Sequence, residues 1–551
     1  MRRPSCRARS QPRAAAWLPA LAALILGLAV VGPVLRVGSP PTYLFRYDLL
    51  FVPRFHRLLS QIGRGELWNH APLLLALEAT TATGGGAFVE RLLLVAIPAL
   101  AFWAAARACA HVGQPGALAA GTLYAANPFV YERLAAGEWT LLLGYAVAPL
   151  VWHRAFAWVA GEARGGRALA AAVGWWAVAT LSSAHHAVLL GTLLAFGLPF
   201  AAVGIPGGGR RLAALGALDL AAVAWWVLPG LGPGGAPPIG PGDFLAFAPT
   251  PIPALGTGAT TLGLYGFWRG GVGQTLDWER PGWVALLVVL LLLVAAGLGD
   301  GVVRGGGRDR RRFAGLTLAG AVAFVLAFGP APPFAPFNTA LFLHLPGFRA
   351  LRESGKWTGL LPLLYAAAFA RMPGLATRAL HRLRPRPVGV GAACALVLFV
   401  AAYTPSLWWG LGGQWRPGTY PPVYARAEDI TRADRRPGLI LPLPWALYVA
   451  PGFARGVVLN PARDYFTRPV LLTDDPDIPG GAPPDPRRAA IERLTSADGG
   501  ERATTLRGLG VRYLLVDAPY DARAFARDPC LALRDDDGGT ALWEFRCLDP
   551  P

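Results

Sequence analysis

The sequence predicts an α-helical polytopic membrane protein that ends in a small α/β domain. Of the 551 residues, 54% are hydrophobic and only 15% are charged, and the mean hydropathy is +0.40. These values lie outside the range of soluble globular domains. Apolar stretches of about 20 residues, the length that crosses a bilayer, alternate with breaks rich in Gly, Pro or Arg. After Tyr403 the composition changes to that of a soluble chain.

The apolar stretches predict about eleven membrane-spanning helices. The first follows the basic segment MRRPSCRARSQPR and is longer than the apolar part of a cleaved signal peptide, so we expect an uncleaved first span. The predicted spans lie near residues 15–36, 88–108, 115–133, 139–159, 167–183, 186–204, 211–231, 281–299, 313–331, 357–372 and 387–405.

The arginines predict the orientation of these spans. The formal net charge is +18, but the arginines gather in short loops between apolar stretches and form no continuous basic groove for nucleic acid. With a cytoplasmic N-terminus, the loops GEARGGR, GGGRR, VVRGGGRDRRR and RMPGLATRALHRLRPRPVG all fall on the cytoplasmic side, as positively charged loops do. The same alternation places the C-terminus outside the cell membrane.

Three long loops are predicted on the external side, at 37–87, 232–280 and 332–356. The first mixes apolar and basic residues, which is typical of helices that lie along a membrane surface. We therefore divide the chain into a multispanning transmembrane domain, 1–411, and a soluble extracytoplasmic α/β domain, 412–551. In the second domain GLILPLPW and VRYLLVD read as buried strands.

The five cysteines, Cys6, Cys109, Cys394, Cys530 and Cys547, have no metal-site or CxxC spacing. Cys530 and Cys547 flank a predicted hairpin with an Asp-Gly turn. A disulfide across this hairpin and two free thiols are both compatible with the spacing.

Asp48, in YLFRYDLLFVP, is the single Asp of the first predicted external loop and lies among aromatic and aliphatic residues. Such surroundings raise the pKa of a carboxyl group, whereas Arg46 or Arg54 nearby would lower it. Asp48 is therefore a candidate general base. The alternative is an ion pair that holds the loop on the membrane.

Two glutamates and an arginine, Glu132, Arg133 and Glu138, lie between two apolar stretches in NPFVYERLAAGEWTLLLGYAVAPL. If one span ends near Arg133 and the next begins near Trp139, all three charges lie in a tight turn at the external face. They either line a substrate cavity or form a Glu–Arg pair that caps a helical hairpin.

The segment FRALRESGKW contains Arg349, Arg352, Glu353 and Lys356 just before the tenth predicted span. Lys356 is the only lysine in the chain, and all other members of the 51 Lys and Arg residues are arginines. A compact ammonium group in so arginine-rich a sequence indicates a phosphate-binding role. Chance is the alternative.

His185 and His186, in SSAHHAVLL, lie at the predicted external turn between spans five and six. Adjacent histidines point apart on a helix, so shared metal ligation is not expected; one of them could contact a phosphate or a sugar hydroxyl. Packing at the interface is the alternative. Asp219, inside span seven, fits a proton-coupled transporter or a carboxylate drawn toward Arg210 and Arg211.

The external loop with its acidic residue, the segments NPFVYERLAAGEWTLLLGYAVAPL and FRALRESGKW, and a C-terminal domain with GVRYLLVD together resemble the multispanning GT-C glycosyltransferases. Within that superfamily the chain looks most similar to prokaryotic relatives of the actinobacterial arabinofuranosyltransferases and to the YfhO-type membrane proteins. The resemblance covers most of the chain. It implies an inverting transfer of sugar from a polyprenyl-phosphate donor to a cell-envelope glycan or lipid acceptor at the external membrane face.

The resemblance also implies roles for individual residues. Asp48 matches the acidic base of the first external loop, and Glu66 is a poorer match. Arg349, Arg352 and Lys356, in the segment that also holds Glu353, would stabilise the departing phosphate. Glu132 and Glu138 would line the cavity and orient sugar hydroxyls.

One departure concerns metal dependence. Many GT-C enzymes carry paired acids in the first external loop, some of them metal-binding, whereas no Asp or Glu stands beside Asp48. We therefore expect no cofactor, because no paired-acid motif supports the divalent metal that the resemblance otherwise allows. The same departure leaves open that the protein has lost catalysis. Two alternatives to the enzyme stay open. One is a transporter or flippase for a lipid-linked or other polar substrate, which would use Asp219 together with Glu132 and Glu138. The other is a non-catalytic membrane scaffold that works through residues 412–551.

Overall fold

The computed structural model describes residues 14–56, 71–230, 239–268, 276–345, 347–380, 385–473, 475, 485–518 and 520–548. A helix lies at every predicted span. The helices that coincide with predicted spans are α1 (Ala14–Val31), α4 (Gly86–Ala108), α5 (Gln114–Ala125) with α6 (Pro128–Ala135), α7 (Trp139–Val159), α8 (Gly166–Ser182), α9 (His185–Gly197) with α10 (Pro199–Ala202), α11 (Gly208–Gly230), α14 (Trp283–Val303), α15 (Gly307–Ala327), α17 (Leu361–Phe369) and α19 (Pro385–Tyr403).

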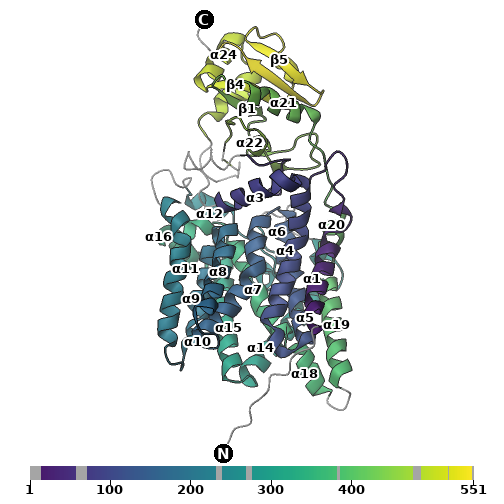
Figure 1. The fold of residues 1–551 in the computed structure, drawn as a ribbon, viewed down its shortest axis with the longest axis vertical. Helices are drawn as coiled ribbons and strands as arrows, with labels where there is room; N and C mark the ends of the chain where they lie inside the picture. The colour runs from purple at the N-terminus through teal and green to yellow at the C-terminus, as the bar shows by residue number, and fades with distance from the viewer. Residues whose placement is uncertain are drawn as a thin grey trace, which may run out of the picture.

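The helices form one elongated bundle, and the C-terminal domain sits on one end of it (Figure 1). That end, which we call the domain face, also carries α3 (Ala71–Gly84) and α12 (Pro241–Ala246). The opposite end of the bundle carries α10 and α18 (Met372–Ala379). Residues 57–70 of the first predicted external loop, including Glu66, lie outside the described residues.

In the described part of the chain, five helical stretches are long and apolar enough to cross a membrane by themselves. A sixth results if Pro387–Tyr403 and Pro405–Gly413, which meet at 77°, form one bent span. Other predicted spans are interrupted or charged: α5 ends at Ala125 and Asn127 then caps α6, and α15 opens with GRDRRR. The predicted count of eleven stays a prediction. The five stretches are Trp17–Leu35, Gly86–Ala108, His185–Ala202, Trp283–Val303 and Ser354–Ala379.

The C-terminal domain is a four-stranded sheet with helices, as the sequence predicts. The strand order is β1 (Leu439–Leu443), β4 (Val511–Asp517), β6 (Thr540–Phe545) and β5 (Leu531–Asp536). β1 and β4 are parallel and the other pairs antiparallel. Every residue of β4 is buried, and five of its seven residues are apolar, as expected of a strand covered on both faces. Cys530 and Cys547 form a disulfide at the end of the β5–β6 hairpin.

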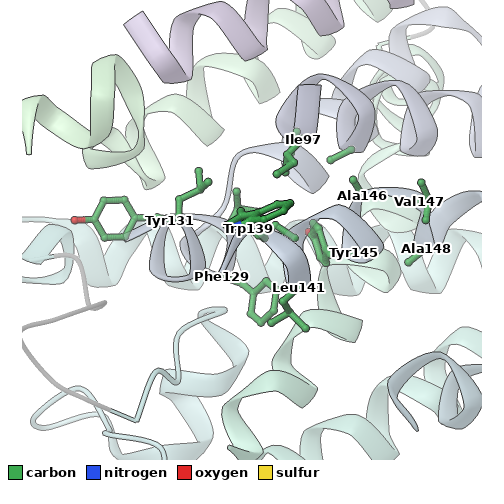
Figure 2. Packing of buried hydrophobic residues seen from close by; sticks show 14 of the residues in the cluster. Ile97, Phe129, Tyr131, Trp139, Leu141, Tyr145, Ala146, Val147 and Ala148 are labelled. Carbon is green, nitrogen blue, oxygen red and sulfur yellow. The ribbon is translucent and has the colours of Figure 1, made fainter. Parts of the chain in front are cut away.

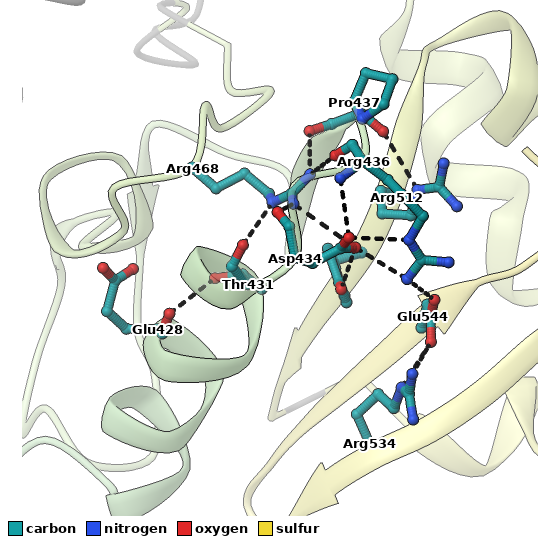
Figure 3. Close-up of polar contacts among 11 residues, drawn as sticks. Glu428, Thr431, Asp434, Arg436, Pro437, Arg468, Arg512, Arg534 and Glu544 are labelled. Carbon is teal, nitrogen blue, oxygen red and sulfur yellow. Dashed lines mark hydrogen bonds and ion pairs between the residues drawn. The ribbon is translucent and has the colours of Figure 1, made fainter.

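Ion pairs attach α21 (Pro422–Ala433) to this sheet (Figure 3). Arg436 donates to Asp434 (2.9 Å) just after the helix and to Glu544 of β6 (2.6 Å). Arg534 of β5 donates to the other oxygen of Glu544 (2.6 Å). Glu544 is almost completely buried, so its two charged partners offset the cost of removing it from water.

The first loop and the C-terminal domain are joined by backbone hydrogen bonds. Tyr47 pairs with the hairpin of β2 (Tyr448–Val449) and β3 (Val458–Leu459): its N–H donates to Val457 O (2.7 Å), and Leu459 N–H donates to its carbonyl (2.9 Å). Tyr43 exchanges two further bonds with Gly418 (2.8 and 2.9 Å). The loop is therefore an extra strand-like layer between bundle and domain, and its position is fixed from both sides.

Candidate active site at the domain face

A short turn between α6 and α7 supports the site. Pro128 begins α6 and the Asn127 side chain caps it by accepting from Val130 N–H (3.2 Å), the usual chemistry of a helix start. Phe129, Trp139 and Tyr145 pack into a buried cluster around this turn (Figure 2). The turn is thereby held rigidly at the domain face.

Gly137 lets the first loop lie directly on this turn. Its φ of +77° belongs to the left-handed region that favours glycine. A Cβ at this position would lie 2.2 Å from Leu49 N and 2.9 Å from the carbonyl carbon of Asp48. The Asp48 N–H donates to Ala136 O (3.2 Å). The close backbone approach places Asp48 beside Glu138.

Four further charged side chains meet at this point. Arg133, fully buried, donates to Glu138 (2.8 Å) and to Glu353 (3.2 Å). Lys356 Nζ lies 2.9 Å from Glu353 and 4.0 Å from Glu138. Asp48 is within electrostatic range of both glutamates and of Lys356. We call these five residues, Asp48, Arg133, Glu138, Glu353 and Lys356, the charge cluster.

Asp48 has the properties of a base that works near neutral pH. Burial, and then the negative charge of Glu138, raise its pKa to about 7, although a hydrogen bond from the Tyr448 hydroxyl (2.6 Å) pulls the pKa down. A carboxyl group with such a pKa is present in both protonation states at physiological pH. It can therefore accept a proton and release it again.

The pKa values of the two glutamates shift in opposite directions. Burial raises the pKa of Glu138, with Arg133 opposing the rise. Burial also disfavours the charged form of Glu353, but Lys356 and Arg133 outweigh it, so that its pKa is lowered. Three carboxyl groups thus face two cations, and a protonated Asp48 would balance the cluster.

Polar atoms near the charge cluster have spare hydrogen-bonding capacity. Glu138 Oε2 and His186 Nδ1 are buried and have no hydrogen-bond partner among the described residues. His186 lies within electrostatic range of Lys356 and against Gly144 of α7. Buried polar atoms are normally paired, so these atoms are available to a bound substrate.

The other predicted site residues face elsewhere. Glu132 accepts a bond from Gly266 N–H (3.4 Å) and ties the loop after α13 (Gly256–Leu262) to α6. Arg349 is exposed and donates to carbonyl oxygens at the end of α16 (Ala335–His344). Arg352 lies over the ring of Phe247 (4.7 Å) and within electrostatic range of Glu353. His185 contacts the Ser183 hydroxyl (3.0 Å).

Tyr448 is the site residue that the sequence analysis missed. It lies 400 residues from Asp48 along the chain, in a hairpin of ordinary composition. The short apolar pairs Tyr448–Val449 and Val458–Leu459 on either side of a Pro-Gly turn indicate a hairpin. They do not indicate which group the Tyr448 hydroxyl contacts.

Asp219, the residue that favours a transporter, lies in α11 away from the charge cluster. Its side chain is buried, and Oδ1 has no hydrogen-bond partner among the described residues. Across the residues that the structure describes, no three His, Cys, Asp or Glu side chains are grouped to hold a metal ion.

No family model and no curated protein sequence matches the chain. Solved structures do. The chain is similar to the arabinofuranosyltransferase AftD from Mycobacteria, with a TM-score of 0.61 and 18% identity over 98% of this chain and 40% of that one. The R1389S mutant of AftD has a TM-score of 0.57 and 18% identity over 98% of this chain and 42% of that one. ArnT from Cupriavidus metallidurans has a TM-score of 0.43 and 14% identity over 98% of this chain and 100% of that one.

The likeness to AftD confirms the fold that the resemblance predicted. The chain has the GT-C fold of membrane glycosyltransferases, with apolar helices followed by a small sheet domain. It spans about 40% of the length of AftD.

Proposed function

We propose that this protein is an inverting GT-C-type glycosyltransferase that moves a sugar from a polyprenyl-phosphate donor to a cell-envelope glycan or lipid acceptor. The observation that carries the proposal is the position of Asp48, with a pKa raised to about 7, within the charge cluster and in electrostatic range of Lys356. The arabinofuranosyltransferase activity in the name of AftD supports the same class of reaction.

In the proposed step, the Asp48 carboxylate accepts the proton of an acceptor hydroxyl while that oxygen attacks the anomeric carbon. The bond between the anomeric carbon and the donor phosphate oxygen breaks, and the phosphate leaves with the electron pair. Lys356 stabilises the developing charge, as a pre-positioned cation does. Attack and departure on opposite faces invert the anomeric configuration. Because Lys356 and Arg133 supply the positive charge, the proposed reaction needs no metal.

We place the domain face outside the cell membrane. The Cys530–Cys547 disulfide supports this orientation, because disulfides persist in oxidising compartments. The arginines at the opposite end of the bundle support a cytoplasmic location for that end; they include Arg210 and Arg211 in the first turn of α11, Arg371 before α18 and Arg378 within it. The donor then reaches the charge cluster from the outer leaflet.

A transporter or flippase is the second candidate, and the buried Asp219 carboxyl favours it. The two functions separate in one experiment on purified protein in liposomes with a radiolabelled polyprenyl-phosphate sugar. We expect transfer to an acceptor that Asp48→Asn abolishes and Asp219→Asn leaves intact. Movement of the lipid across the bilayer that Asp219→Asn abolishes, with no transfer product, would favour transport.

A further inference from the structure

A polar pocket lies between the first loop and the C-terminal domain. Its walls come from three segments of the chain. They are residues 44–47 of the first loop, residues 414–416 after α20 (Trp408–Gly413), and residues 455–457 of the β2–β3 hairpin. The space inside measures about 70 Å³, which holds roughly five water-sized groups. A phosphate group has this size, and a sugar ring is larger.

The charge in this pocket is positive. Arg46, Arg416 and Arg455 line it, and none of its described lining residues is acidic. Arg416 and Arg455 are both exposed. Three guanidinium groups around one small space favour an oxyanion that accepts several hydrogen bonds.

A buried donor adds to this preference. Trp415 lines the pocket, its side chain is 3% exposed, and its indole Nε1 has no hydrogen-bond partner among the described residues. Indole N–H groups are donors only. The pocket therefore contains a hydrogen-bond donor that no described protein group satisfies, in addition to the guanidinium groups.

The pocket adjoins the proposed base. Tyr47 lines the pocket and the next residue is Asp48; the hairpin that supplies Gly456 and Val457 also carries Tyr448, which donates to Asp48. In an inverting displacement the base contacts the acceptor hydroxyl, and the leaving phosphate lies on the opposite face of the sugar. A ligand group on the Asp48 side therefore belongs to the acceptor.

We propose that this arginine pocket binds a phosphate group of the acceptor, so that the acceptor is a phosphate-bearing glycan or lipid and not a neutral one. The identification of the ligand as the acceptor rests on the proposed glycosyltransferase function. The binding of phosphate itself can be measured without any transfer reaction.

The binding test uses the full-length protein in phosphatidylcholine nanodiscs and inorganic phosphate as the probe, followed by phosphorus NMR line broadening. We expect saturable binding that is weakened about tenfold by Arg416→Gln and by Arg455→Gln, since each removes a charge-assisted hydrogen bond. Arg527→Gln, an exposed arginine elsewhere on the C-terminal domain, is the matched control and should bind as the wild type does. No saturable binding, or equal affinity in all four proteins, would overturn the proposal.

A second arm separates the acceptor from a lipid headgroup. If phosphatidylglycerol in the nanodisc abolishes phosphate binding in the wild type, the pocket holds a headgroup and the assignment to the acceptor is wrong. The third arm compares transfer to a synthetic acceptor with and without a phosphate. We expect kcat/KM at least tenfold higher for the phosphorylated form, with most of that preference lost in Arg416→Gln. Absence of transfer to either form would count against the proposed function and leave the phosphate-binding result standing.

Discussion

Replacing Tyr448 by phenylalanine removes the hydrogen bond that its hydroxyl donates to Asp48 (2.6 Å). This bond stabilises the ionised carboxylate and lowers its pKa, against burial and the charge of Glu138, which raise the pKa to about 7. A hydrogen bond to a charged group contributes about 1.5–3 kcal/mol, and 1.36 kcal/mol corresponds to one pKa unit. Because Asp48 is only partly buried, the lower end applies, and the Asp48 pKa should rise by about 1.

This change has a defined sign in an activity assay. The proposed base must be ionised, so transfer rises with pH through the Asp48 pKa. With a pKa near 7 about half of Asp48 is ionised at pH 7, and with a pKa near 8 only about a tenth. We expect Tyr448→Phe to lower kcat/KM about fivefold at pH 7 and to recover most of it by about pH 9.

The control for this prediction is Tyr420→Phe. Tyr420 is also buried, but its hydroxyl donates to the carbonyl of Phe51 (3.0 Å) and does not contact Asp48. The pH profile of kcat/KM is the first readout. The second is the infrared carboxyl band that Asp48→Asn removes, followed against pH. The role of this hydrogen bond would be refuted if Tyr448→Phe left the pH profile of kcat/KM unchanged, or if both variants shifted that profile equally.

Three further predictions concern the framework of the site. Arg133→Met leaves the buried Glu138 and the partly buried Glu353 without this partner, so the free energy of unfolding should fall by about 3–5 kcal/mol and the thermal midpoint by about 3 °C. The control is Arg304→Met, at a pair 3.8 Å apart with the arginine exposed, which should change the midpoint by less than about 1 °C. Equal shifts would contradict the importance of the buried pair. Gly137→Ala places a Cβ 2.2 Å from a backbone nitrogen, so the first loop must move; we expect at least about tenfold slower transfer from correctly inserted protein, and normal transfer would be the contrary result. Cys530→Ala removes a disulfide of sequence separation 17 that contributes about 3 kcal/mol, so limited proteolysis should cut the C-terminal domain sooner than in the wild type, and unchanged cleavage would argue against that contribution.

The sequence predicted the helices well because bilayer length and apolar composition are local properties. Every predicted span coincides with a helix, and the break at Asn127–Pro128 follows from capping chemistry that acts within three residues. The strands of the C-terminal domain were predicted for the same reason. The buried sequence VRYLLVD forms β4.

The site was harder to predict because its members meet only in three dimensions. Glu132 and Glu138 look equivalent in the sequence on either side of Arg133. The turn at Gly137 directs Glu138 toward Arg133 and Lys356, whereas Glu132 bonds the backbone of Gly266 instead. No local pattern distinguishes the two, since the difference depends on the path of a loop more than 100 residues later in the chain.

The position of the bound donor tests the proposed mechanism most directly. The measurement is an electron cryomicroscopy structure of the full-length protein with a non-hydrolysable polyprenyl-phosphonate sugar in a lipid nanodisc. We predict that the phosphonate lies within hydrogen-bonding distance of Lys356 Nζ, with the anomeric carbon between it and the Asp48 carboxylate. A lipid bound with its phosphonate away from Lys356, or with Asp48 and Lys356 on the same side of the sugar, would contradict the assignment of the charge cluster as the catalytic site.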